Sequence, residues 1–190
     1  MQVRRVVTGH SNDNKAVFVN DDVVAPLVVP GINFEFLRLW GGDRLSVFPD
    51  DGTEPKYQTY FPPESGFRFG IFTIQPAQPS TLEPEQRRAA YEEWGRLFPG
   101  LPQHMEPASP GMHTSDSIDF GYIISGSIWL ELDDGTTKEL HSGDTYIQNG
   151  TRHAWRNRGS EPCSILVVVI GARREPSGIS IAAAQAAGRR

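Results

Sequence analysis

The stretch GDTYIQNGTRHAWRN, residues 143–157, decides the fold of this chain. It places a β-type run before an Asn-Gly turn and a second β-type run after it, which is typical of short strands joined by a tight turn. In the second run His153 and Trp155 alternate with arginines, so the two sets point to opposite faces of a strand. Arginines are rarely buried without partners. We therefore expect the arginines on the outer face and His153 and Trp155 on the inner face.

An earlier stretch, residues 111–126, alternates in the same way. His113, Ser115, Ser117 and Asp119 occupy every second position and share one face if the segment is extended. A face with an imidazole, two hydroxyls and a carboxylate needs a polar environment. That environment is either solvent or a functional cavity.

Short β-type runs separated by turn residues extend outward from these two stretches. The 19 glycines and 15 prolines of the chain suit many short strands better than a helical bundle. The pattern predicts an all-β sandwich or barrel. The predicted strands are residues 4–8, 16–19, 34–40, 68–75, 118–124, 127–132, 137–140, 144–148, 153–157 and 163–170.

One helix is predicted over residues 84–98, because Pro84 suits the first helical position and Gly100 lies just past the end. Its apolar residues recur at helical spacing, and we expect this stripe to pack on the outside of a sheet. The stripe consists of Ala90, Tyr91, Trp94, Leu97 and Phe98. The aromatic and Pro/Gly-rich segment 43–66 shows no periodicity and is expected to be a long loop that makes contacts.

Composition excludes several classes of protein. The chain of 190 residues has a net charge of −5, which argues against a nucleic-acid-binding protein. Its one cysteine, Cys163, cannot form an intrachain disulfide and lies in an apolar run that favours a buried, inert thiol. The longest apolar run is too short to cross a bilayer, and no apolar segment follows the basic N-terminus. A cytoplasmic location is therefore expected.

Residues 111–126 resemble the first motif of the cupin family. In that motif two histidines flank one residue, an acid follows a few residues later, and a glycine comes after it. Here His113 stands first, Ser115 occupies the place of the second histidine, Asp119 stands for the usual glutamate, and Gly126 is in register.

Residues 143–157 resemble the second cupin motif, which opens with Gly-Asp and closes with a histidine, three residues and an asparagine. Gly143, Gly150, His153 and Asn157 match this pattern. The spacing before the glycine turn is tighter than usual, and the usual proline is missing.

This resemblance implies a cupin-type double-stranded β-helix, a conical jelly-roll barrel, over residues 67–171 with the one flanking helix inside that range. Residues 1–66 then form an N-terminal β extension and the long aromatic loop, which pack on the barrel or on a partner subunit. Residues 172–190 are a C-terminal tail. Cupins commonly pair through their sheets, so a homodimer is expected.

The resemblance also implies a metal centre inside the barrel. His113, Asp119 and His153 fall at ligand positions, whereas the Ser115 hydroxyl is a poor ligand. At most three protein ligands would hold one divalent ion and leave coordination positions open. The residues do not distinguish Fe, Zn, Mn, Ni or Co. The alternative is a metal-free barrel whose histidines and aspartate are hydrogen-bonded.

Further residues are candidates for contact with a small-molecule substrate. Gln148 and Tyr146, which precede the turn before His153, are the candidates for proton transfer. The expected substrate contacts are Ser115, Ser117, Trp155, Arg38 and Trp40. Arg38 would hold a carboxylate or form a surface ion pair. The other histidines, His10, His104 and His141, are expected in solvated turns and loops.

The most favoured function is a metal-dependent enzyme acting on a small polar or polyketide-like metabolite, as a lyase, dehydratase or isomerase. Two alternatives remain open. One is a non-haem Fe(II) dioxygenase using the same ligands. The other is a non-catalytic, ligand-binding cupin, which the serine at position 115 favours.

Overall fold

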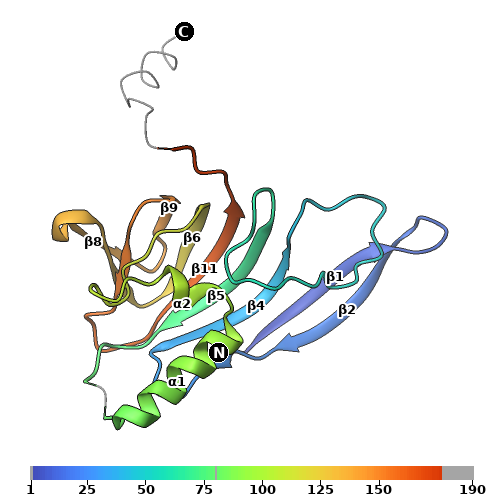
Figure 1. Ribbon diagram of the computed structural model, residues 1–190. Coiled ribbons are helices and arrows are strands. Elements are labelled where there is room, and N and C mark those ends of the chain that lie inside the picture. The colour runs from blue at the N-terminus through green and yellow to red at the C-terminus, as the bar shows by residue number, and fades with distance from the viewer. Residues whose placement is uncertain (1, 80, 177–190) are drawn as a thin grey trace.

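A computed structural model of the chain describes residues 2–79 and 81–176 (Figure 1). The fold is built mainly from strands. These are β1 (Val3–His10), β2 (Ala16–Val24), β3 (Leu27–Val28), β4 (Phe34–Gly42), β5 (Phe67–Ile74), β6 (Ser117–Ser125), β7 (Ser127–Glu131), β8 (Thr137–His141), β9 (Thr145–Asn149), β10 (Ala154–Arg156) and β11 (Cys163–Gly171). The helices are α1 (Pro84–Leu97) and α2 (Leu101–His104), and a 3-10 turn spans Asp133–Gly135.

Two antiparallel sheets enclose the centre of the molecule. The larger has the strand order β3-β4-β5-β11-β6-β9 and the smaller has the order β10-β7-β8. Ile123 of β6, Ile128 of β7 and Ile165 of β11 have no exposed surface and meet in one core cluster. Burial of the facing apolar surfaces favours this closed arrangement, so the predicted all-β jelly-roll barrel is confirmed.

Every predicted strand is present, but several are longer than predicted and two elements were missed. β3 and α2 are too short to leave a periodic pattern. Gly41 and Gly42, expected to end a strand at residue 40, stay paired with β5. A side chain at Gly41 would crowd the carbonyl of Phe67, so glycine here permits close strand contact rather than ending the strand.

The alternation on the strand before and within β6 is confirmed. His113, Ser115, Ser117 and Asp119 are all buried, whereas Phe120 on the opposite parity is 42% exposed. These polar side chains therefore face a cavity rather than solvent.

The arginines of the second stretch lie on the outer face as predicted. Arg152 bonds to Glu106 at 2.6 Å and to Asp133 at 2.9 Å. Arg156 bonds to Glu131 at 2.7 Å. Because these guanidinium groups are paired at the surface, the face that carries His153 is turned inward.

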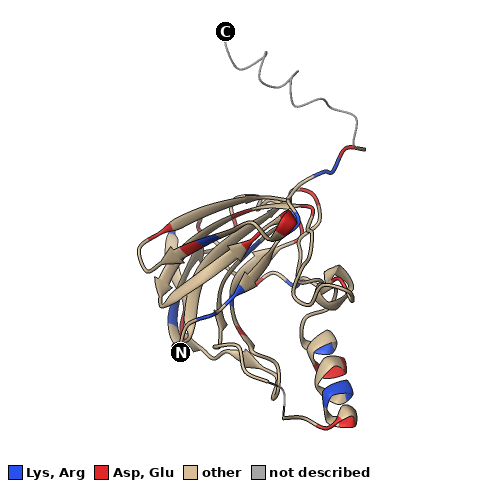
Figure 2. Ribbon diagram, turned by 90° about the vertical axis from the view of Figure 1, so that its left-hand side faces the viewer, with Lys and Arg blue, Asp and Glu red and all other residues tan. Residues whose placement is uncertain are grey.

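The apolar stripe of α1 does not pack on the outside of a sheet, so that expectation was wrong. Trp94 and Phe98 join the same core cluster as Phe36 and Phe72 of the inner sheet face. The inner face at this end consists of large aromatic side chains that need an apolar cover, and the helix provides it. Figure 2 shows acidic and basic residues along α1, where pairs such as Arg96–Glu93 face solvent.

The N-terminal extension is a separate two-stranded sheet of β1 and β2. Val3 and Val24, at its base, pack against the outer face of the large sheet at Leu37, Leu39 and Ile71. The predicted long loop, residues 43–66, contains no helix or strand. It touches the extension, where His10 donates its backbone N–H to the Asp50 carbonyl at 2.7 Å.

Two further expectations concern the membrane and the C-terminal tail. Among the described residues, no helix is long and apolar enough to cross a membrane. The tail that was expected to fray or to pack on a partner, residues 176–190, lies outside the described residues beyond position 176.

The close packing of β6 on β9 can be tested at Gly121. A Cβ at this position would overlap the ring of Tyr146 on the neighbouring strand. We therefore expect Gly121→Ala to lower the free energy of unfolding by about 1–3 kcal/mol, because overpacking forces the ring out of place. Urea unfolding of the purified chain measures this change.

The matched control is Gly95→Ala in α1, where the new methyl group would lie 3.6 Å from Pro102. This variant should gain up to about 1 kcal/mol through helix propensity. If Gly121→Ala unfolded at the same urea concentration as the natural chain, the packing of Tyr146 on Gly121 would be wrong.

Candidate functional site

His113 and His153 lie opposite each other in an isolated antiparallel bridge. Each donates its backbone N–H to the carbonyl of the other, with N–O distances of 2.9 Å in both directions. Directly paired residues of antiparallel segments point to the same face. The centroids of the two imidazoles are accordingly only 4.2 Å apart. The bridge therefore places two histidines that are far apart in the sequence next to each other on the inner face.

Backbone carbonyls orient both imidazoles. Nδ1 of His113 lies 3.1 Å from the Gly111 oxygen, and Nδ1 of His153 lies 2.9 Å from the Thr151 oxygen. Because a carbonyl only accepts, Nδ1 carries the proton in each ring and Nε2 keeps a free lone pair. Burial lowers the pKa of His113, and burial together with His113 lowers the pKa of His153 to about 4. Both rings are neutral near pH 7.

Asp119 is a buried carboxyl group on β6, held by a chain of hydroxyls. The Ser117 hydroxyl donates to Oδ1 of Asp119 at 2.7 Å, and the Ser115 and Ser117 hydroxyls lie 2.9 Å apart. Burial raises the pKa of Asp119 to about 6, although the bond from Ser117 acts in the opposite direction. This carboxyl group therefore changes its protonation state close to neutral pH.

The residues at the predicted metal positions do not form one ligand cluster. Across residues 2–79 and 81–176, no three His, Cys, Asp or Glu side chains are placed to share a metal ion. The Nε2 atoms of His113 and His153 suit two ligand positions, and backbone acceptors commonly orient ligating imidazoles in this way. Asp119 is engaged by Ser117 and does not complete the set. The donor set thus fits two coordination positions rather than the expected three.

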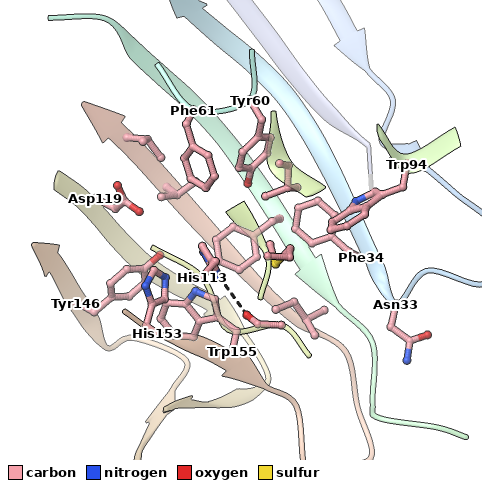
Figure 3. Close-up of a pocket in the computed structure, with 17 residues that line it drawn as sticks. Asn33, Phe34, Tyr60, Phe61, Trp94, His113, Asp119, Tyr146, His153 and Trp155 are labelled. Carbon is pink, nitrogen blue, oxygen red and sulfur yellow. Dashed lines mark hydrogen bonds between the residues drawn. The ribbon is translucent and has the colours of Figure 1, made fainter. Parts of the chain in front are cut away.

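A cavity of about 250 Å³ lies inside the barrel, with His113, His153 and Asp119 in its wall (Figure 3). Tyr146 is the other residue with a polar group on this side. The rest of the wall is largely aromatic, formed by Phe34, Tyr60, Phe61, Phe72, Trp94 and Trp155. A few polar groups on an otherwise apolar wall are typical of a site for a small organic molecule.

Of the two proton-transfer candidates, only Tyr146 reaches the cavity. Its ring packs 4.7 Å from that of Trp155. Burial and the nearby Asp119 raise the pKa of Tyr146 well above its usual value, so the phenol stays protonated. Gln148 is buried but does not line the cavity. Its amide donates to the backbone and hydroxyl oxygens of Thr151 and so stabilises the turn before His153.

The predicted substrate contacts divide into three groups. Trp155 lines the cavity. Ser115 and Ser117 do not line it, but act through the bond to Asp119. Arg38 and Trp40 do not line it either, and a bulge between them breaks the parity on which their shared orientation depended. The Arg38 guanidinium lies 4.9 Å from the ring centre of Tyr57, and Trp40 lines a separate groove beneath the N-terminal extension.

Sequence reasoning missed several cavity residues because they come from the loop and the helix. Tyr60 and Phe61 reach the cavity from the segment 43–66, whose aromatic content was the only signal. Trp94 reaches it from α1, and its buried Nε1 finds no acceptor among the described residues. In Figure 3 the Trp94 indole lies on the opposite side of the cavity from Asp119.

The remaining histidines lie away from the two cavity histidines or at the surface. His141 is 62% exposed, as predicted. His104 is exposed but sits in the short helix α2 rather than in a loop. Its Nδ1 bonds to the Thr114 carbonyl at 2.9 Å, and its ring packs 4.7 Å from that of Phe61.

Known proteins match parts of this chain. The Phomopsin biosynthesis cluster protein C' of Diaporthe leptostromiformis is 43% identical over 58 residues, which are 30% of this chain and 31% of that protein. The cupin-domain-containing oxidoreductase virC of Hypocrea virens is 37% identical over 46 residues, 24% of each chain. The matched segments thus span about a third or less of these relatives.

Solved structures resemble this chain more loosely. The polyketide cyclase RemF from Streptomyces resistomycificus superposes with a TM-score of 0.42 and 17% identity, covering 83% of this chain and 82% of that chain. A predicted oxalate decarboxylase from Thermotoga maritima also gives 0.42, with 14% identity over 78% of this chain and 93% of that one. At these TM-scores neither similarity bears on activity.

A family model described as the cupin domain matches residues 102–169. This range contains both motif stretches, the paired histidines and Asp119. The chain therefore belongs to the cupin superfamily through the domain at residues 102–169.

Proposed function

We propose that this chain is a biosynthetic enzyme that transfers protons on a small, largely apolar molecule held in the barrel cavity. The observation that carries the proposal is the placement of a buried carboxyl group and two neutral imidazoles in one aromatic-walled cavity. Proton transfer by such groups drives isomerisation and elimination, including dehydration.

The protein groups in this reaction have complementary roles. Asp119 has a raised pKa of about 6 and can donate a proton near neutral pH, whereas His153, with a pKa of about 4, stays neutral and can accept one at Nε2. Environments that separate the pKa values of neighbouring groups are typical of acid–base pairs. Tyr146 stays protonated and can donate a hydrogen bond to a substrate oxygen.

The walls of the cavity favour an unsaturated or ring-bearing substrate. Phe34, Phe72 and Trp155 offer flat faces on which a conjugated or aromatic body can stack. A polyketide-like metabolite has this character. Two of the relatives are described as products of biosynthesis clusters for phomopsin and oryzines, which supports a role in the synthesis of small molecules.

The acid–base roles predict the behaviour of two variants. Asp119→Asn and His153→Gln should each lower the rate about 10²–10⁴-fold, because each removes one partner of the proton transfer. A suitable assay is the conversion of small cyclic β,γ-unsaturated ketones to their conjugated isomers, followed by ultraviolet absorbance. Asp134→Asn and His141→Gln, both at exposed positions, are the matched controls and should leave the rate unchanged.

The pH profile of the same reaction follows from the two pKa values. The rate should fall as the pH rises through about 6, where Asp119 loses the proton it donates, and as it drops through about 4, where His153 becomes protonated. The proposal would be wrong if no ketone of the series reacted faster with the natural chain than with Asp119→Asn.

The metal-dependent alternative retains one structural support, the two adjacent Nε2 atoms of His113 and His153. Because the third ligand is not in place, we expect purified protein to contain much less than one equivalent of Fe, Zn, Mn, Ni or Co. Elemental analysis of the natural chain and of His113→Ala measures this. Stoichiometric metal that is lost in His113→Ala would establish a metal-dependent enzyme instead.

Oxygen uptake separates the remaining alternatives. Three relatives are described as cupin-domain-containing oxidoreductases, and an Fe(II) dioxygenase would consume oxygen when loaded with Fe(II). A chain that binds aromatic ligands without turnover would be a ligand-binding cupin. A cytoplasmic location for any of these functions stays a prediction.

A further inference from the structure

The N-terminal arm, defined as β1 and β2 (residues 3–24), has apolar side chains on the face turned away from the barrel. Paired residues of an antiparallel ladder share a face, and the register pairs Thr8 with Phe18, Val6 with Asp21 and Arg4 with Val23. On this outer face Val6, Phe18 and Val23 are 47%, 80% and 61% exposed. A two-stranded sheet is only marginally stable by itself, and exposed apolar residues of this size favour a binding partner.

A second uncovered apolar surface lies on the large sheet. The sheet patch, defined as Phe120, Tyr122, Ile147 and Ile170, lies on the outer face of β6, β9 and β11. Phe120 and Ile147 are direct cross-strand partners, and the exposed fraction of Ile147 is 60%. The patch contains no charged side chain, so a partner would cover it without removing a charge from water.

The arm and the sheet patch lie side by side on the same side of the barrel. Through Val3 and Val24 the inner face of the arm already packs on Leu37, Leu39 and Ile71 of that outer face. Figure 1 shows the arm next to β4, whereas β6 and β9 lie toward the other edge of the sheet. The outer face is therefore half covered by the chain's own arm and half uncovered.

We infer that the outer face of the arm docks on the sheet patch of a second copy of this chain, and that the second copy docks in the same way in return. The chain carries both halves of the contact, which is the requirement for a closed two-fold dimer. Packing of the arm on this sheet face already occurs within one chain, and the sheet patch continues the same face. The two arms then form one layer between two sheets, which explains why the arm is apolar on both faces.

The charges on the arm are compatible with this contact. Arg4 and Asp21 form an ion pair on the outer face, with an N–O distance of 2.6 Å. The pair neutralises the only charged groups that would face the partner's apolar patch. It also lies beside Val6 and Val23 rather than at Phe18, so the most exposed apolar side chain of the arm is free to make contact.

Sedimentation velocity of the full chain tests the inference through two single variants. The natural chain should sediment as a dimer. Phe18→Lys on the arm and Ile147→Glu on the patch should each weaken dimerisation about a hundredfold or more, because each buries a charge at the centre of both copies of the contact. Leu132→Lys, at a position that is 37% exposed outside both surfaces, is the control and should remain a dimer.

Mixing the two variants tests which surfaces meet. In a mixed dimer one contact pairs the new lysine with the new glutamate, and the other contact is entirely natural, so the dimer should return. Circular dichroism of each variant checks that the fold is retained. A monomeric natural chain, dimeric single variants or a mixture that stays monomeric would each overturn the inference.

Discussion

The reciprocal backbone hydrogen bonds between His113 and His153 are the constraint on which the site depends. They hold the segment before β6 against the start of β10 and thereby join the two sheets at the cavity. The same geometry makes the two side chains point to one face, and the carbonyls of Gly111 and Thr151 then orient the rings. Without this bridge, two histidines from distant parts of the sequence would not face the same ligand.

Burial then determines the chemistry of these groups. Removal from water disfavours charge, which lowers the pKa of an imidazole and raises that of a carboxyl group. His153 and Asp119 are shifted in opposite directions for this one reason. The serine that stands in place of a second histidine has a related effect, because Ser115 and Ser117 form hydrogen bonds that hold Asp119 rather than offering a metal ligand.

The loop, the helix and the arm show how a small barrel is completed by segments outside its strands. Tyr60 and Phe61 from the loop and Trp94 from α1 close the cavity with aromatic surface. The arm covers half of the outer sheet face and leaves the other half uncovered. The apolar surface that remains exposed is the physical reason to expect a second copy at this place.

By itself, the sequence determined the strands, the inward face of His113, Ser115, Ser117, Asp119 and His153, and the outward face of the arginines, because alternation is a local property of an extended chain. Only the tertiary structure decided what depends on distant contacts. A bulge separated Arg38 from Trp40, the helix turned its stripe to the inner face, and Asp119 remained outside a three-ligand cluster. Each of these outcomes depends on how strands pair and pack, for which the order of residues carries no local signal.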